Sequence, residues 1–334
     1  MKRLFGLIAA SAILLGACGT DDNTENTTNT NTAVEENTAD TNTTTNEEAG
    51  NEEPANENES NEAANGTVTY ESESGPIEVP ADPQRVVVLA TFAGNAMALD
   101  ANLVGVDSWA MSNPEYSSYL DGVEAVDETN VESVLELEPD LIIGLSTTEN
   151  IDQFSQIAPT VTYTYGELDY KEQHIEIGKL LNKEDEAREW VEDYEARAQA
   201  AGDSVREEIG EDTTVTVVEN FDKQLYIFGD NFARGTEILY QEMELEMPEA
   251  VQDVVSEDGF YAISTEVLSE YVGDYLVISQ PSDQESEYQQ TETYQSIPAV
   301  QNGNVIEFPA ESGFFNDPIT IDLLLGTFEE AFLN

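Results

Sequence analysis

The sequence predicts an α/β protein of two Rossmann-like lobes joined by a long, rigid α-helix. Two observations predict this architecture. Apolar segments rich in β-branched residues alternate with helical segments across residues 67–168 and again across 203–334, which is typical of mostly parallel sheets covered by helices. Between them, residues 169–202 place apolar side chains near a 3.6-residue period and contain no proline. That pattern predicts one continuous linking helix, with Gly202 as its C-terminal stop.

The chain begins with the pattern of a secretory signal. Lys2 and Arg3 precede a short apolar run that ends at Leu15, and Cys18, the only cysteine, follows two small residues. The run is too short to span a bilayer, so residues 1–17 are predicted to be a signal peptide. With no second cysteine, the chain is expected to form no internal disulfide.

A low-complexity segment follows the signal. Residues 18–66 are rich in Asn, Thr, Glu and Ala and contain no Lys or Arg. Such a segment cannot bury enough apolar surface to offset its ordering entropy, so it predicts a disordered acidic tether. The rest of the chain is expected to form an N-terminal lobe at 67–168, the linking helix at 169–202 and a C-terminal lobe at 203–334.

Each lobe is expected to contain four strands. In the N-terminal lobe they lie at residues 85–90, 103–106, 141–143 and 161–165, with helices at 94–100, 131–137 and 151–157. In the C-terminal lobe they lie at 213–218, 225–228, 276–278 and 305–308. One further helix begins within 234–240, and a closing helix spans 318–333 with Asp317 as its N-cap and Pro318 in its first turn.

The two lobes share a repeated pair of acidic positions. Glu132 precedes Asp140 by eight residues, and Glu266 precedes Asp274 by the same spacing. Each Asp opens an expected strand, and each Glu is expected at the start of a helix. The repeat suggests that both lobes follow one plan. Chance is the alternative, because helix–strand units with acidic first turns are common.

The composition is strongly acidic. The chain has 70 acidic and 11 basic residues, which give a formal net charge of −59. Such a surface repels nucleic acid and anionic lipid headgroups, so neither is expected as a partner. It suits a protein that works outside the cell at high salt or high pH, where screening relieves the self-repulsion.

The residues offer little for catalysis. His174 is the only histidine, and its place in the first turns of the linking helix predicts a solvated or helix-cap residue. One histidine excludes a His-rich metal site, and the chain has no Gly-x-x-x-x-Gly-Lys-Ser/Thr phosphate loop. Carboxylates are too numerous to identify a glycosidase pair. We therefore expect a protein that is not an enzyme and has no catalytic residues, no metal ligands and no cofactor.

With these features together, the chain resembles the iron-siderophore-binding lipoproteins of ABC importers, of the ferric-hydroxamate type. The resemblance covers nearly all of residues 67–334 and is carried by segments 85–90, 103–106, 138–143, 178–184 and 226–240. It implies the class III periplasmic-binding-protein fold and a monomer that delivers a ferric siderophore to an ABC permease. Iron would be present only as part of the bound siderophore.

The N-terminus resembles a bacterial lipobox, Leu15-Gly16-Ala17-Cys18. In that family the thiol of the cysteine receives a diacylglyceryl group and becomes the mature N-terminus, and two acyl chains anchor a protein stably. The resemblance implies lipidation at Cys18 and a location on the extracellular face of the cell membrane. An ordinary secretory signal with a chance cysteine is the alternative.

The resemblance also implies ligand-binding residues. The segment Tyr226–Gly235 is similar to the C-lobe loop in which a Tyr, an aromatic residue and an Arg face the ligand, and Tyr226, Phe232 and Arg234 occupy those positions. Phe232 departs from the more usual Trp, which puts a hydrogen bond at that position in doubt. Further candidates by position are Tyr165, Phe308, Phe315 and Trp109. Each aromatic residue could instead be an ordinary core residue, and Arg234 could be a first-turn base that pairs with surface carboxylates.

The same family docks to its permease through one glutamate on each lobe, and Glu132 and Glu266 match those positions. An ordinary acidic surface is the alternative for both.

The few basic residues bear on the ligand. Nine remain after the signal, and five of them, Lys171, Lys179, Lys183, Arg188 and Arg197, lie on the linking helix. A receptor for strongly anionic iron–catecholate complexes would need a basic cluster, so this scarcity favours a neutral or cationic chelate. Other functions remain open: a corrinoid, haem or other metal-chelate binder on the same fold, a surface enzyme, or an adhesion or sensor module.

Overall fold

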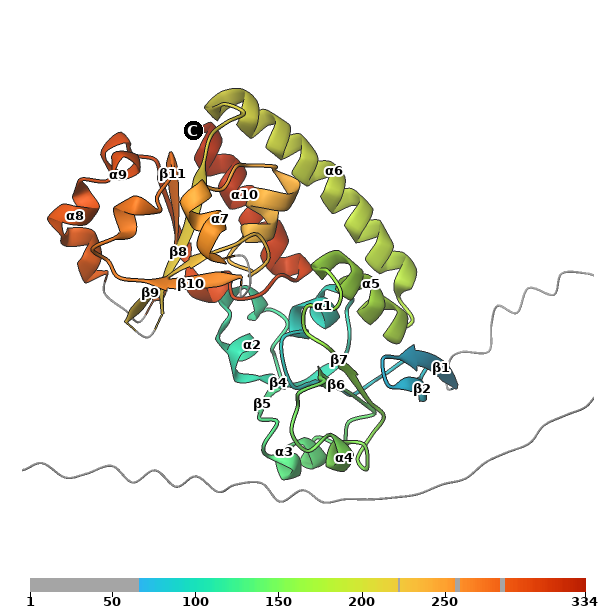
Figure 1. Cartoon of the computed structure of the whole chain (residues 1–334). Coiled ribbons are helices and arrows are strands. Elements are labelled where there is room, and N and C mark those ends of the chain that lie inside the picture. The colour runs from blue at the N-terminus through green and yellow to red at the C-terminus, as the bar shows by residue number, and fades with distance from the viewer. Residues whose placement is uncertain (1–65, 222, 256–258, 283–285) are drawn as a thin grey trace, which may run out of the picture. The chain divides into compact units, whose positions relative to one another are not determined.

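The computed structural model describes residues 66–221, 223–255, 259–282 and 286–334. The predicted signal peptide, Cys18 and nearly all of the predicted tether lie outside these residues. Within them, the chain forms two five-stranded sheets and a two-stranded hairpin, and Figure 1 shows the helices that surround each sheet. No helix of this described part is long and apolar enough to cross a bilayer. The prediction of a two-lobed α/β protein is confirmed.

The N-terminal lobe is built on a wholly parallel sheet of order β5-β4-β3-β6-β7. Its central strands are apolar on both faces because helices cover both sides. The strands are β3 (Val86–Val88), β4 (Leu103–Asp107), β5 (Glu124–Val126), β6 (Leu141–Leu145) and β7 (Thr160–Tyr163). The helical segments are α1 (Ala93–Ala98), α2 (Ser108–Ser112), η1 (Pro114–Tyr116), α3 (Val131–Glu136) and α4 (Ile151–Phe154).

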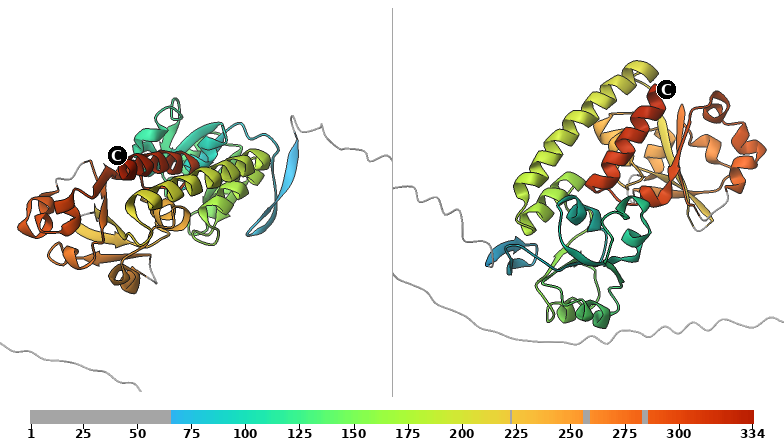
Figure 2. Two further views of the ribbon diagram at one scale, coloured as in Figure 1. Left: turned by 90° about the horizontal axis from the view of Figure 1, so that it is seen from above. Right: turned by 180° about the vertical axis from the view of Figure 1, so that it is seen from behind.

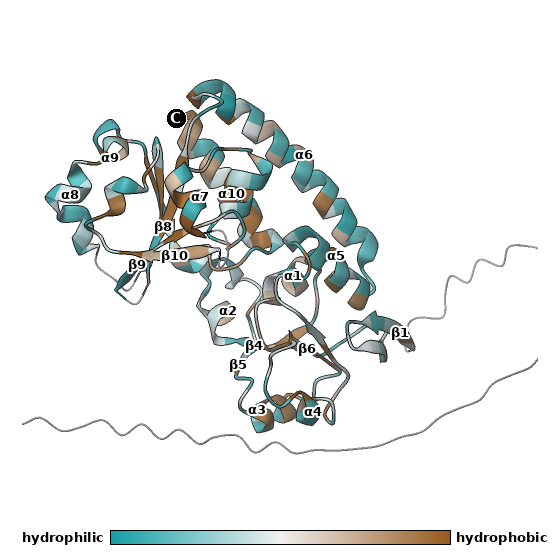
Figure 3. Cartoon of the chain, in the orientation of Figure 1, coloured by the Kyte–Doolittle hydropathy of each residue, from teal (hydrophilic) through white to brown (hydrophobic). Residues whose placement is uncertain are grey.

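The C-terminal lobe has a mixed sheet of order β10-β9-β8-β11-β12. Strand β9 runs antiparallel to both of its neighbours, so this lobe is less parallel than the sequence suggested. The strands are β8 (Val215–Phe221), β9 (Gln224–Phe228), β10 (Phe260–Ile263), β11 (Tyr275–Gln280) and β12 (Val305–Pro309). The helical segments are η2 (Glu237–Glu242), α7 (Glu249–Val255), η3 (Leu268–Glu270), η4 (Glu287–Gln290), α8 (Glu292–Gln295), α9 (Pro298–Asn302), η5 (Ala310–Ser312) and α10 (Pro318–Leu333). Figure 3 shows apolar residues along β8 and mainly hydrophilic residues along α6.

Both sheets follow the same strand order, in which the first strand of the lobe lies beside its fourth. The two repeated aspartates have equivalent roles in this plan. Asp140, before β6, accepts hydrogen bonds from the backbone N–H groups of Gln84 and Arg85 before β3. Asp274, before β11, accepts one from Thr214 N–H before β8. Ligands bind open α/β sheets at the carboxyl ends of the strands where the strand order reverses, here between β3 and β6 and between β8 and β11.

The connection between the lobes consists of two helices, α5 (Tyr170–Leu180) and α6 (Glu184–Ile209), instead of the single helix predicted. The break includes Asn182, whose φ of 57° lies in the left-handed region. Helix α6 continues past Gly202 and ends at Gly210, whose positive φ suits a helix terminus. Figures 1 and 2 show α6 running beside α10. Because α5 packs on α1 and α6 packs on η2 and α10, each half of the connection is fixed to one lobe.

The closing helix α10 also contacts both lobes. Asp317 caps it by accepting hydrogen bonds from Ile319 N–H and Thr320 N–H, as predicted from the sequence. Helix α10 packs against α1 of the N-terminal lobe and against α6, and Ile319 in its first turn packs on the core of the N-terminal lobe. Phe315, just before α10, lies in the apolar core of the N-terminal lobe and stacks on Tyr116. The lobes therefore meet at a buried contact as well as through the linking helices.

A hairpin of β1 (Thr67–Ser72) and β2 (Gly75–Pro80) precedes the N-terminal sheet and was not predicted. Its buried Tyr70 donates a hydrogen bond to Glu176 of α5 at 2.7 Å. The same hydroxyl lies 3.1 Å from that of Tyr163 on β7. The hairpin is thereby attached to the N-terminal lobe and to the first linking helix.

Candidate functional site

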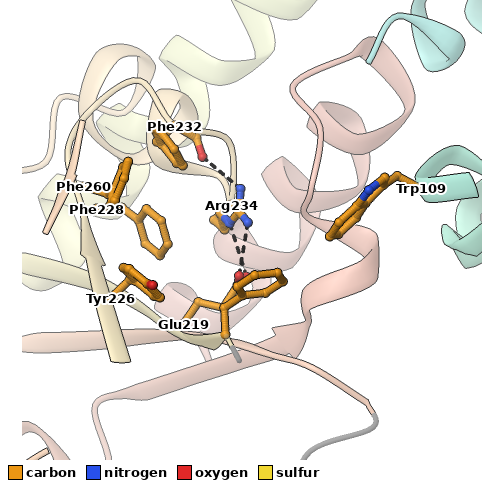
Figure 4. Close-up of a pocket in the computed structure, with 8 residues that line it drawn as sticks. Trp109, Glu219, Tyr226, Phe228, Phe232, Arg234 and Phe260 are labelled. Carbon is orange, nitrogen blue, oxygen red and sulfur yellow. Dashed lines mark hydrogen bonds and ion pairs between the residues drawn. The ribbon is translucent and has the colours of Figure 1, made fainter. Parts of the chain in front are cut away.

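An aromatic pocket of about 250 Å³ lies at the carboxyl end of β8, where the C-terminal lobe faces α2 of the N-terminal lobe. Figure 4 shows Arg234 at its centre, with a group of rings on one side and Trp109 on the other. The pocket is lined by Trp109, Glu219, Phe221, Tyr226, Phe228, Phe232, Arg234 and Phe260. Five of these side chains are phenylalanine or tryptophan rings, so the lining is largely apolar.

The loop that carries Arg234 has an unusual backbone. Ala233, Arg234 and Gly235 have φ values of 54°, 57° and 78°, so three successive residues adopt the left-handed region. Non-glycine residues rarely adopt this conformation, and clusters of it occur at sites that position a functional group. At Gly235 glycine is also required by space, because a Cβ would collide with the ring of Phe328. Arg234 therefore precedes the helical segment η2 and is not the first-turn helix residue that the sequence suggested.

Buried polar groups fix this loop. Phe232 N–H donates to Thr236 Oγ1 at 3.0 Å, and Ala233 N–H donates to Glu237 Oε1 at 2.9 Å. Arg234 N–H donates to the carbonyl of Gly313 at 2.8 Å. Burial raises the pKa of Glu237, and the hydrogen bonds that it accepts oppose that rise. The loop is thus fixed by hydrogen bonds on its inner side, which offsets the cost of its backbone conformation.

The guanidinium of Arg234 forms a two-point ion pair with Glu219. Nε and Nη2 of Arg234 lie 3.2 and 3.1 Å from the two carboxylate oxygens of Glu219, which is fully buried. Ser279 Oγ, on the neighbouring strand β11, donates to the same carboxylate at 2.5 Å. Two-point pairs of this kind fix the plane of the guanidinium as well as its position. Figure 4 shows the pair at the base of the pocket.

Aromatic rings surround the guanidinium. Its Cζ lies 5.1 Å from the ring centroid of Phe228, 5.7 Å from that of Phe232 and 5.4 Å from that of Phe314. Cations attract ring faces at such distances. Trp109 closes the opposite side, with its ring 5.1 Å from Phe314 and 49% of its surface exposed. Asp107 positions it by capping α2 through Trp109 N–H and Ala110 N–H.

The structure brings together four of the seven residues that the resemblance suggested for ligand binding, namely Trp109, Tyr226, Phe232 and Arg234. Tyr165 is 58% exposed and lines a neighbouring hollow with Asn231 and Asn316. Phe308 is buried against Phe328, and Phe315 is buried against Tyr116. These last two rings pack in the cores and do not line the pocket.

Sequence reasoning missed four lining residues: Glu219, Phe221, Phe228 and Phe260. Glu219 follows the apolar strand segment Val215–Val218, and a carboxylate next to a buried strand is a signal that sequence analysis could have used. It was not noticed because acidic residues are so frequent in this chain. Phe228 ends the strand expected at 225–228, and Phe221 lies three residues beyond the strand expected at 213–218, so neither was a candidate. Phe260 belongs to β10, which was not predicted.

The prediction of a solvated His174 is wrong. The side chain is 1% exposed, and its Nδ1 lies 3.1 Å from Asn95 Oδ1 of α1. Its ring meets the ring of Trp190 edge-on at 5.2 Å, and Trp190 Nε1 donates to Asp322 of α10. Burial lowers the pKa of His174 to about 4. The histidine is therefore a neutral packing residue where α1, α5, α6 and α10 meet.

The two glutamates suggested for permease docking are both exposed, one on each lobe. Glu132 lies in the first turn of α3, as expected. Glu266 lies in the turn between β10 and η3 and does not begin a helix, so the repeat is less regular than the sequence suggested. Among the described residues, no group of three or more His, Cys, Asp or Glu side chains could hold a metal ion.

Comparison with known proteins places this geometry in a family. Residues 91–312 match the family described as Periplasmic binding protein. The chain is 32% identical to the iron(3+)-hydroxamate-binding protein FhuD of Bacillus subtilis over 263 residues, which cover 77% of this chain and 83% of that protein.

Solved structures resemble it over a similar length. The FhuD protein from S. pseudintermedius has a TM-score of 0.73 and 34% identity, and the match covers 80% of this chain and 98% of that one. FhuD2 from Staphylococcus aureus with bound ferrioxamine B has a TM-score of 0.72 and 32% identity, with 75% and 98% covered.

Proposed function

The chain belongs to the periplasmic binding protein family, and from this premise we propose that it is the substrate-binding protein of an ABC importer. Its substrate is a ferric siderophore, of the hydroxamate type. The protein captures the chelate between its lobes and delivers it to the permease. Binding, without chemical change of the ligand, is its task.

The observation that carries this proposal is the chemistry of the aromatic pocket. A ferric tris-hydroxamate has an iron that is already fully ligated, an almost neutral core and an organic shell. A receptor for it needs apolar walls and a few hydrogen-bond donors, and it needs no metal ligands of its own. The pocket offers rings on both sides and one guanidinium whose charge is balanced by Glu219.

Trp109, Tyr226, Phe232 and Arg234 are the residues that we assign to ligand contact. Tyr165 extends the contact from the neighbouring hollow. Phe308 and Phe315 support the site from the two cores. The position of the pocket beside the carboxyl end of β8 favours this assignment, because ligands of open α/β sheets bind at such ends.

Two further parts complete the transport cycle. Lipidation of Cys18 holds the protein, as a monomer, on the extracellular face of the cell membrane, where the acidic segment 18–66 acts as a tether. Glu132 on one lobe and Glu266 on the other pair with basic groups of the permease. Charge pairs of this kind set the orientation of docking more than its strength.

Intrinsic fluorescence titration of the purified protein tests the proposal. Ferrichrome and ferrioxamine B should quench the fluorescence with saturation at nanomolar to micromolar ligand, and Arg234→Ala should weaken both. Arg188→Ala, which removes an exposed arginine of α6, is the matched control and should bind as the wild type does. Quenching by haem or cobalamin, without a response to either hydroxamate, would instead assign the pocket to another metal chelate.

A further inference from the structure

The pocket contains one feature that its proposed ligand does not explain. A fully buried carboxylate, Glu219, lies directly beneath the guanidinium that faces the ligand. Burying a carboxylate is costly unless it is paired and hydrogen-bonded. A neutral pocket could be built more simply from apolar side chains, so the pair must provide something that apolar residues would not.

The sheet holds Glu219 in place. Glu219 is paired in register with Ser279 of the adjacent parallel strand, and the Ser279 hydroxyl donates a hydrogen bond to the carboxylate of Glu219. Both residues are fully buried. A side chain held on two sides within a sheet cannot move away when a ligand arrives, so its charge is a permanent part of the pocket floor.

The pair determines the net charge of the pocket. Of the eight described lining residues shown in Figure 4, Arg234 and Glu219 are the two charged ones. Their charges cancel, and the remaining side chains are aromatic. An anionic chelate therefore meets no uncompensated positive charge, and its own charge would lie above a low-dielectric floor that contains a carboxylate.

The pair also limits how Arg234 can bind a ligand. Of its five N–H groups, two donate to Glu219 and one points to the carbonyl of Phe232 at 3.4 Å, so two remain. Two donors suit single hydroxamate oxygens. Glu219 already occupies the Nε/Nη2 edge of the guanidinium, so an anionic ligand could pair only at the remaining Nη1/Nη2 edge, with a guanidinium whose charge is already balanced.

We propose that Glu219 is a specificity-determining residue of this site. It neutralises Arg234 and fixes its plane, so that the pocket accepts uncharged and cationic ferric chelates and discriminates against anionic ones. This inference rests on the proposed function, since it assumes that the pocket binds ferric chelates.

A ligand series with one iron core and a variable pendant charge tests the inference. Ferrioxamine B is cationic, its N-acetyl derivative is neutral and its N-succinyl derivative is anionic. Wild-type protein should bind the anionic chelate more weakly than the cationic one. Glu219→Gln should shift the ratio of the two dissociation constants by about tenfold in favour of the anionic chelate, the scale expected of one added charge near a partly screened ligand.

Further variants separate charge from folding. Arg234→Gln should shift the ratio in the opposite direction, and Glu219→Gln combined with Arg234→Gln should return it to the wild-type value, because both charges are then absent. A merely structural role of Glu219 would weaken all three ligands alike. The control Glu189→Gln removes an exposed carboxylate of α6 that lies outside the pocket, and it should leave the ratio unchanged.

The outcomes are distinct. The inference is overturned if wild type and Glu219→Gln bind all three chelates with the same ratio of dissociation constants for the anionic and cationic ligands. The proposed function would then remain intact. A double variant whose ratio equals that of Arg234→Gln has the same two consequences, even if Glu219→Gln alone does not fold. Absence of binding of all three chelates to wild-type protein overturns the proposed function itself.

Discussion

Tyr116 donates a hydrogen bond to Asp317 across the two lobes, with 2.5 Å between Oη and Oδ2. Asp317 is buried and at the same time caps α10. Gly94 of α1 lies so close that a Cβ there would collide with Asp317. The first turn of the closing helix is thereby fixed to the N-terminal lobe, and we expect any closure of the lobes to pivot near this contact.

Removing this bond should destabilise the protein. Tyr116→Phe leaves an oxygen of a buried carboxylate without one of its donors, so the free energy of unfolding should fall by about 1–3 kcal/mol in urea denaturation. Tyr119→Phe removes a hydroxyl from a ring that is 42% exposed and should have almost no effect. Equal stability of the two variants would show that the Tyr116–Asp317 bond contributes nothing to the lobe contact.

The pKa of His174 predicts a pH-dependent stability. Burial lowers the pKa to about 4 in the folded protein, while the unfolded value is about 6.5. The unfolded chain therefore binds the proton first, so this stabilising contribution is complete above pH 6.5 and is lost as the pH falls toward 4, by up to about 3 kcal/mol.

The difference in unfolding free energy between wild type and His174→Gln isolates that contribution from the many carboxylates that titrate in the same range. The difference should be constant above pH 6.5. Below pH 6.5 the wild type should lose stability relative to the variant, because only the wild type contains the buried histidine. A difference that stays constant down to pH 4 would contradict a buried, neutral histidine.

The two tryptophans should respond differently to ligand. Trp109 lines the pocket, whereas Trp190 packs against His174 and Tyr194 at the junction of the helices. Trp190→Phe should keep most of the ligand-dependent quenching, and Trp109→Phe should lose most of it, because only the former variant retains the tryptophan beside the chelate. Quenching that follows Trp190 would place the ligand away from the aromatic pocket.

Docking and capture should be separable. Reversing the charge of Glu132 and Glu266 with lysine should leave the dissociation constant for ferrioxamine B unchanged, since both side chains are exposed and outside the pocket. Uptake of the iron chelate by cells that carry the variant should stop. Glu189→Lys makes the same charge change on the exposed side of α6 and should preserve uptake. Loss of binding and uptake together would contradict the docking role.

Much of the fold could be predicted from the sequence because buried strands have a simple signature. The eight expected strands all occur, and all but β7, which alternates as Thr-Val-Thr-Tyr, contain successive apolar residues. Of the strands that were not predicted, β5 is a short Glu-Ala-Val segment and lacks that signature, and the hairpin strands β1 and β2 are mostly exposed or half-buried. Strand β10 does contain an apolar run, Phe260–Ile263, although three of its four residues are exposed. The break between α5 and α6 depends on the left-handed backbone at Asn182, a residue type that is common at helix ends, and it was missed because the apolar 3.6-residue period continues on both sides of it.

The site was harder to predict for a physical reason. Tyr226, Phe232 and Arg234 lie close together in sequence, so a local motif could suggest them. Glu219 and Phe260 reach the pocket only through the register of β8, β9 and β10, which is a tertiary property. A buried His174 was missed because its burial depends on α1 and α6, two helices on either side of it in the sequence.

A crystal structure of the protein with ferrioxamine B tests the central claim most directly. We expect the chelate between Trp109 and the rings around Phe232, with Arg234 still paired to Glu219 and donating to hydroxamate oxygens. The iron should keep six hydroxamate oxygens and gain no protein ligand. A chelate bound elsewhere, or an iron coordinated by a side chain of the protein, would contradict the account.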